Sequence, residues 1–71
     1  MPLSFAKAGQ KVRVFAITAE QELRSRLVAM GIIPGEEIEI ILSLSRDSFV
    51  VAVKGSRIML DREMAQQIQV A

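Results

Sequence analysis

The sequence contains no cysteine, no histidine, no tryptophan and no tyrosine among its 71 residues. Without cysteine, neither a disulfide nor a thiolate metal site can stabilise the chain. Without histidine as well, the side chains best suited to hold a transition metal are missing. The serines and threonines also have no imidazole base to activate them as nucleophiles. We therefore predict a non-enzymatic protein that holds no metal and needs no cofactor.

Long hydrophobic runs and an excess of one charge are missing too. No apolar run approaches the roughly 18 residues that a membrane-spanning helix needs, and the first residues do not resemble a signal peptide. Nine basic and eight acidic residues give a net charge of +1, and the basic residues form no stripe that would bind nucleic acid. These absences predict a cytoplasmic protein, with no membrane insertion and no nucleic-acid partner. Self-association is compatible with the sequence.

What the chain does have is many short alternating segments within a single domain, residues 1–71. Hydrophobic residues make up 51% of it, and this content allows a packed core even near the lower size limit of independent domains. Alternation predicts strands over 11–17, 36–44, 49–54 and 57–61, with a shorter one at 68–70. The side chains expected to point inward are Val12, Val14, Ala16, Ile38, Ile40, Leu42, Leu44, Phe49, Val51, Val53, Ile58 and Leu60. The pattern predicts a mainly β fold, a small barrel of about five strands.

One segment between the first two strands has helical spacing instead. Thr18 and Gln21 match a capping box, and Leu23, Leu27 and Met30 form one apolar stripe. The spacing therefore predicts a helix that begins after Thr18 and packs this stripe against the strands.

The end of this helix and the turn after it carry the strongest local signals of the sequence. Gly31 is placed to take the left-handed conformation that ends a helix, with Ile32 contacting Leu27. Pro34 and Gly35 then occupy the two central positions of a type II turn. We predict that these residues fix how the helix lies on the barrel.

Two further turns and a cap are predicted nearer the C-terminus. Residues 45–48 should form one hairpin tip, and residues 54–57 a tight turn with Gly55 and Ser56 at its centre. Asp61 should cap a short helical turn in the segment that follows.

The strand faces opposite the predicted core also carry apolar residues, more than one short helix can cover. We expect them to line an apolar groove between helix and barrel that binds a partner protein. The predicted contact residues are Phe15, Ile17, Met30, Ile41, Val50 and Met59. The alternative, that they simply form the core between helix and barrel, fits the sequence equally well.

The only acidic cluster, Glu36, Glu37 and Glu39, allows two interpretations. Glu37 and Glu39 share one strand face, where their oxygens could hold a hard cation weakly. The solvated face of an amphipathic strand is the favoured interpretation, so no metal ligand is assigned.

Three segments together resemble the FeoA family, the small cytoplasmic component of bacterial ferrous iron uptake. The pattern RL..MGI.PG..I.I runs from Arg26 to Ile40, preceded by LSFAKAGQKVRVFAI at residues 3–17 and followed by KGSRIMLDREMAQQIQV at residues 54–70. The resemblance implies an SH3-like barrel with a helix between its first two long strands. It also implies a partner, the large membrane ferrous iron transporter that carries a cytoplasmic GTP-binding domain.

One segment departs from the family, and a second function shares its fold. Many relatives have a Gly-Asp-Pro loop between the second and third strands, where this chain has SRDS at residues 45–48. A related barrel forms the last domain of some metal-dependent repressors, so the alternative function is a module of such a regulator. A free chain of 71 residues that begins with methionine favours the accessory protein of iron uptake.

Overall fold

The computed structural model describes residues 1–45 and 47–71, except for the side chains of Leu44 and Ser45. The predicted inward position of Leu44 lies outside this described part. The five strands are β1 (Lys11–Ile17), β2 (Glu37–Ser45), β3 (Ser48–Val53), β4 (Ser56–Asp61) and β5 (Ile68–Val70). Helix α1 (Gln21–Ala29) lies between β1 and β2, α2 (Arg62–Gln66) joins β4 to β5, and a 3-10 helix η1 (Leu3–Phe5) precedes β1. The predicted mainly β fold with one helix between the first two strands is confirmed.

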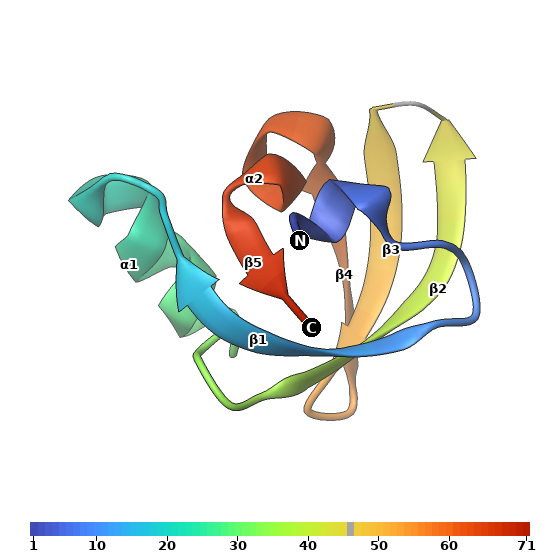
Figure 1. Cartoon of the computed structure of the whole chain (residues 1–71), viewed down its shortest axis with the longest axis horizontal. Coiled ribbons are helices and arrows are strands. Elements are labelled where there is room, and N and C mark those ends of the chain that lie inside the picture. The colour runs from blue at the N-terminus through green and yellow to red at the C-terminus, as the bar shows by residue number, and fades with distance from the viewer. Residues whose placement is uncertain (46) are drawn as a thin grey trace.

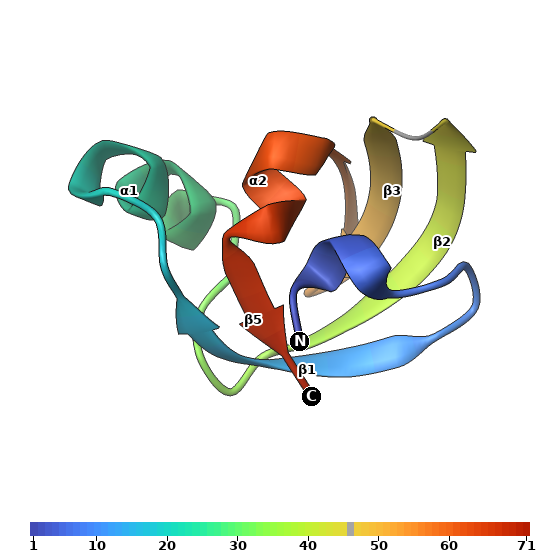
Figure 2. The ribbon, with the colours of Figure 1, turned by 45° about the horizontal axis from the view of Figure 1, so that its top comes forward.

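The strands form one antiparallel sheet in the order β4-β3-β2-β1-β5. The sheet is strongly rolled (Figure 1), but β4 and β5 end it as two separate edges in the described chain, so it is not a closed barrel. The expected barrel is therefore open between these strands. Helix α2 and η1 lie on the concave side, between β5 and β3 (Figure 2).

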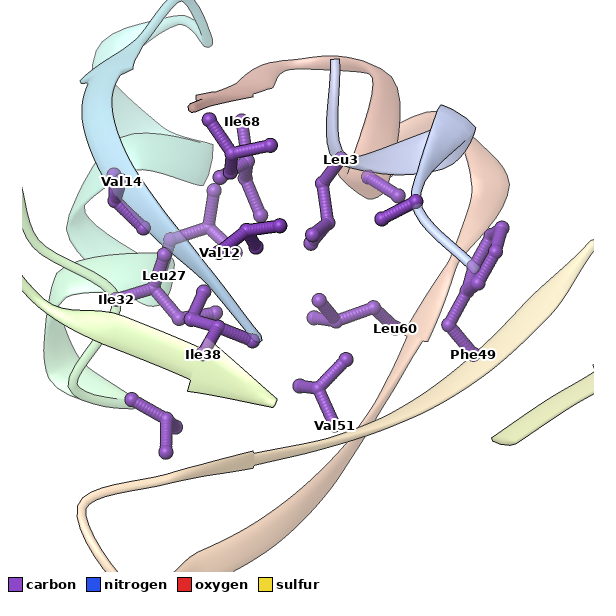
Figure 3. Packing of buried hydrophobic residues seen from close by; sticks show 14 of the residues in the cluster. Leu3, Val12, Val14, Leu27, Ile32, Ile38, Phe49, Val51, Leu60 and Ile68 are labelled. Carbon is purple, nitrogen blue, oxygen red and sulfur yellow. The ribbon is translucent and has the colours of Figure 1, made fainter. Parts of the chain in front are cut away.

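The core fills the concave side of the sheet and takes side chains from every element (Figure 3). Most of the predicted inward residues are in it, so those placements are confirmed. The buried hydrophobic residues are Leu3, Ala6, Val12, Val14, Ile17, Ala19, Leu27, Ile32, Ile38, Ile40, Phe49, Val51, Val53, Leu60, Ala65, Ile68 and Val70. No described helix is long and apolar enough to cross a membrane.

A β-bulge in β1 reverses which side chains face the core. The pairing of β1 with β5 shifts between Val14 and Ala16, and an inserted residue turns every later side chain to the opposite face. Ile17 is consequently buried, whereas Ala16 is only half-buried. The predicted inward position of Ala16 and outward position of Ile17 are wrong for this reason.

A second bulge lies in β2, in its pairing with β3, and likewise reverses which side chains face the core. Ile40 pairs with Val51 and Leu42 with Val50, so Ile41 is the extra residue. Leu42 is 38% exposed, and its predicted inward position is wrong. The bulge therefore moves a large apolar side chain from the core to the surface.

Helix α1 begins later than predicted and without the capping box. Its N-cap is Glu20, which makes no side-chain capping bond. The main-chain N–H and the hydroxyl of Thr18 both donate to the carbonyl of Gln67, at 2.8 and 3.2 Å. Thr18 thus prolongs the contact of β1 with the chain around β5, and this tertiary contact replaces the local cap.

The end of α1 has the geometry of a Schellman motif. Gly31 has φ +92°, its N–H donates to Val28 O at 2.9 Å, and Ile32 N–H donates to Leu27 O at 3.0 Å. Leu27 and Ile32 both belong to the core (Figure 3). The chain therefore leaves the helix at a fixed angle, with apolar side chains on both sides of the glycine anchored.

The following turn is attached directly to β1. Glu36 N–H donates to Ile33 O at 3.1 Å around Pro34 and Gly35, and Gly35 has φ +93°. Gly35 N–H also donates to Val14 O at 2.7 Å. The turn thus fixes the start of β2 against β1 as well as reversing the chain.

The loop of the β3–β4 hairpin lies one residue earlier than predicted, whereas the predicted cap of α2 is present. Val53 pairs with Ser56, and both Lys54 (φ 51°) and Gly55 (φ 77°) are left-handed, as a two-residue type I′ loop requires. The predicted centre at Gly55 and Ser56 is wrong by one residue. The predicted cap is confirmed, since Met64 N–H donates to Asp61 Oδ1 at 2.8 Å.

Replacing Gly31 with valine should lower the free energy of unfolding by about 1–2 kcal/mol, because a left-handed backbone is unfavourable for a branched side chain. An added Cβ would meet Lys54 Cδ at 3.5 Å, an ordinary contact, so backbone strain rather than crowding sets the cost. Chemical denaturation measures it. Gly31→Asn is the control, since asparagine tolerates this conformation better. Equal stability of the valine variant and the wild type would contradict the assignment.

Candidate functional site

The six predicted contact residues do not lie together. Ile17 is buried, and Met30 is partly buried against the core. Phe15 is 58% exposed on β1. Ile41, Val50 and Met59 lie on neighbouring strands of the convex side of the sheet. The structure therefore divides the predicted set into core residues, one isolated phenylalanine and one group of three.

That group is part of a continuous apolar row across three strands. Val50 pairs with Met59 of β4 on one side and with Leu42 of β2 on the other. The strand neighbours Phe49, Val51 and Leu60 are buried, so this row faces away from the core. We name the four residues Ile41, Leu42, Val50 and Met59 the outer-face patch.

Exposure and the β2 bulge give the outer-face patch its shape. Met59 is 62% exposed and Leu42 is 38% exposed, with the half-buried Val50 between them. Ile41, also half-buried, adjoins Leu42 on β2. Because Ile41 is inserted next to Leu42, two residues of β2 oppose the single Val50 of β3. The bulge thereby widens the apolar surface at this end of the row.

Leu42 is absent from the predicted contact residues because unbroken alternation along β2 would place it inward. A signal was present, since Ile40, Ile41 and Leu42 are three consecutive apolar residues in an otherwise alternating segment. Such a break in the period is typical of a bulge.

Phe15 is separated from the outer-face patch by charged residues. Lys11 of β1 pairs with Glu39 of β2, and Arg13 pairs with Glu37. These residues face away from the buried Val12 and lie between Phe15 and the patch on the convex side. Arg13 is further held by a 2.6 Å hydrogen bond from its Nη1 to Gly35 O. Phe15 therefore does not extend the patch.

Between α1 and α2 the surface is hollowed, but its lining is mostly charged. Leu23 and Met64 supply apolar contact there, and the other lining residues are Glu20, Glu22, Arg26, Asp61, Glu63 and Gln67. Among the described residues that line it, none belongs to the predicted contact set. The apolar lining expected for a groove between helix and sheet is not found in this hollow.

The carboxylates of the described chain do not converge on a metal site. No three of its Asp and Glu residues gather closely enough to hold an ion, and Glu36 contacts the ammonium group of Lys54 at 3.7 Å. The absence of a bound metal from the protein stays a prediction.

Accordingly, anaerobic calorimetry with Fe²⁺ should detect no stoichiometric binding at sub-micromolar affinity. Oxygen ligands alone hold divalent transition metals weakly compared with histidine and cysteine, and this chain has neither. A saturable sub-micromolar site would contradict the prediction and would direct attention to the acidic hollow between α1 and α2.

Comparison with known proteins gives a consistent family assignment. The FeoA domain model matches residues 1–71. A curated protein of Methanocaldococcus jannaschii, "Putative Fe(2+) transport protein A", is 38% identical over 69 residues, which are 97% of this chain and 83% of that protein. A crystal structure of an iron uptake regulatory protein, FeoA, is 30% identical with a TM-score of 0.91, and the match covers 99% of this chain and 93% of that one.

More distant structures share the fold alone. Zinc-complexed FeoA of Stenotrophomonas maltophilia, described as an SH3 domain protein, is 22% identical with a TM-score of 0.86, over 100% of this chain and 89% of that one. A manganese-dependent transcriptional repressor is 20% identical with a TM-score of 0.85, over 96% of this chain but only 39% of the repressor. The SH3-like fold is thus common to two functional classes. The full-length domain match and the 38% identical relative decide between the families: the chain belongs to the FeoA family.

Proposed function

We propose that this protein is a non-enzymatic accessory protein of ferrous iron uptake that works in the cytoplasm. In this role it binds the cytoplasmic, GTP-binding part of the membrane ferrous iron transporter through the outer-face patch. Membership of the FeoA family and the relative named for Fe²⁺ transport support the process. The outer-face patch is the observation that supports binding as the mode of action.

The composition of the outer-face patch is that of a protein-binding surface. An apolar centre of Leu42, Val50 and Met59 excludes water on contact, and the flexible thioether of Met59 adapts to the partner's shape. The adjoining row of the sheet, Glu39, Ala52 and Arg57, supplies charges of both signs at the margin. Apolar centres with polar margins are typical of interfaces between folded proteins.

The sheet also makes this surface rigid. Buried side chains support it from the concave side, including Val51 and Leu60 directly beneath the row. A surface that is already ordered loses little conformational entropy on binding, and this raises affinity for a given contact area. The protein therefore acts by presenting a preformed surface, with no chemical step of its own.

Calorimetric titration of this protein with the purified cytoplasmic part of the transporter tests the proposal. Saturable binding with a negative heat-capacity change is expected, since apolar surface is buried. The alternative, a module of a metal-dependent regulator, is supported only by the shared fold. It predicts binding to the remaining domains of such a repressor instead, and that result would overturn the proposal.

A further inference from the structure

The N-terminal segment covers one of the two edges of the sheet and leaves the other uncovered. The outer edge of β5 is covered by the N-terminal segment: Val70 N–H donates to Met1 O at 2.7 Å, the Met1 ammonium donates to Val70 O at 2.9 Å, and Pro2 bridges to Gln69. Strand β4 pairs only with β3 among the described strands. Its outer edge is therefore open.

The hairpin geometry shows which main-chain groups of β4 point outward. Val53 and Ser56 close the two-residue loop, and alternate residues of an antiparallel strand turn their N–H and C=O groups toward the same neighbour. The main-chain groups of Ser56, Ile58 and Leu60 therefore bond to β3. Those of Arg57 and Met59 point away from β3. No main-chain bond of Arg57 or Met59 outside the sheet is found in the described chain. These groups are free to pair with another strand.

The side chains along this edge would complement those of a second β4 strand that runs in the opposite direction. Arg57, Met59 and Asp61 are exposed and share one face of β4, in the order basic, apolar, acidic. Antiparallel pairing centred on Met59 would place Met59 opposite Met59 of the second copy. Arg57 of each chain would then lie opposite Asp61 of the other. Asp61 uses Oδ1 to cap α2, so its second oxygen, Oδ2, can accept from the guanidinium.

We propose that β4 pairs antiparallel with β4 of a second copy of this chain, about a two-fold axis at Met59. The same surface of each copy is used, as closed two-fold dimers require, and the two sheets become one. The outer-face patches then adjoin across the axis, which doubles the apolar surface. Pairing of the two copies does not depend on transporter binding.

Disulfide trapping tests the register directly, because the chain has no cysteine of its own. Opposed residues of a hydrogen-bonded antiparallel pair have Cα atoms about 5.5 Å apart, inside the range of roughly 4.4–6.8 Å that a disulfide spans. Met59→Cys should therefore form a covalent dimer rapidly under mild oxidation. Arg57→Cys is the matched control on the same edge, since each copy would lie roughly 13 Å from its equivalent along the strand. Equal or faster cross-linking at position 57, or a rate at position 59 no greater than at the exposed helix position of Val28→Cys, would overturn the proposal.

Sedimentation of the Arg57→Glu variant tests the charge pairing. The substitution turns two attractive charge pairs into two repulsive ones, so self-association should weaken by about tenfold or more relative to the wild type. The Leu42→Lys variant should self-associate as the wild type does, because Leu42 lies on β2 and away from the open edge of β4. Its weakened transporter binding with unchanged self-association separates failure of the proposed function from failure of the dimer. Unchanged self-association of Arg57→Glu, or a wild type that stays monomeric at the highest concentration, would overturn the proposal.

Discussion

Replacing Met59 with lysine should weaken binding to the transporter's cytoplasmic part by about 10- to 100-fold. Burial of one large apolar side chain contributes about 1.5–3 kcal/mol, and each 1.4 kcal/mol or so corresponds to a factor of ten in affinity. Met59 is 62% exposed, so the same substitution should change the free energy of unfolding by only about 0.5 kcal/mol or less. Calorimetric binding and thermal unfolding, measured on the same preparation, separate the two effects.

Two companion variants make this result specific to the outer-face patch. Leu42→Lys should weaken binding as Met59→Lys does. Leu42 lies on β2, away from the open edge of β4, so loss of a dimer cannot explain that effect. Val28→Lys carries the same chemical change on α1, at a position that is 45% exposed, and should bind normally. Equal loss of affinity in all three variants would contradict the patch and indicate a general effect of added charge.

Replacing Leu27 with alanine should lower the free energy of unfolding by about 2–5 kcal/mol, the range for large-to-small changes in a core. Leu27 is the buried residue of α1, fully covered by the core. A helix of nine residues is not stable alone in water, and the N-cap makes no side-chain bond. Leu27 is therefore the main apolar anchor of α1, with Leu23 and Met30 partly buried beside it, while Arg24 Nη2 donates to Ile17 O at 3.0 Å.

The expected loss is a large share of the whole stability, since about 0.05–0.15 kcal/mol per residue is usual for folded domains. The melting temperature should fall by about 10 °C or more, and amide exchange should show α1 opening more readily than the sheet. Val28→Ala, on the exposed side of the same helix, is the matched control and should be near neutral. Similar stability of the two variants would show that α1 is held by contacts other than Leu27.

Local signals in the sequence predicted the features that depend on near neighbours along the chain. Asp61 needed only the residues of the next helical turn to act as a cap, and the strand cores around Val12, Ile38 and Val51 needed only uniform alternation. Features that depend on distant partners were not predictable in this way. Thr18 was expected to cap α1, but its hydroxyl donates to the carbonyl of Gln67, which is 49 residues away in sequence.

The direction in which two side chains of the predicted strands face also could not be predicted from alternation. One inserted residue at Ile41 and one near Phe15 reverse the facing of Leu42 and Ile17. Alternation of apolar and polar residues cannot locate an inserted residue unless the alternation is itself interrupted. Such an interruption occurs in β2, where Ile40, Ile41 and Leu42 are consecutive apolar residues. Val50 and Met59 lie on β3 and β4, whose mutual pairing has no register shift. Simple alternation therefore predicted correctly that both side chains face outward.

Chemical-shift mapping tests the outer-face patch most directly. In the experiment, the ¹⁵N-labelled protein is titrated with the unlabelled cytoplasmic part of the transporter. We expect the largest changes at the amides of Ile41, Leu42, Val50 and Met59, with small changes around the acidic hollow and on α1. Changes concentrated instead at Glu22, Arg26 and Glu63, with the amides of the outer-face patch unmoved, would contradict the account and place the partner between α1 and α2.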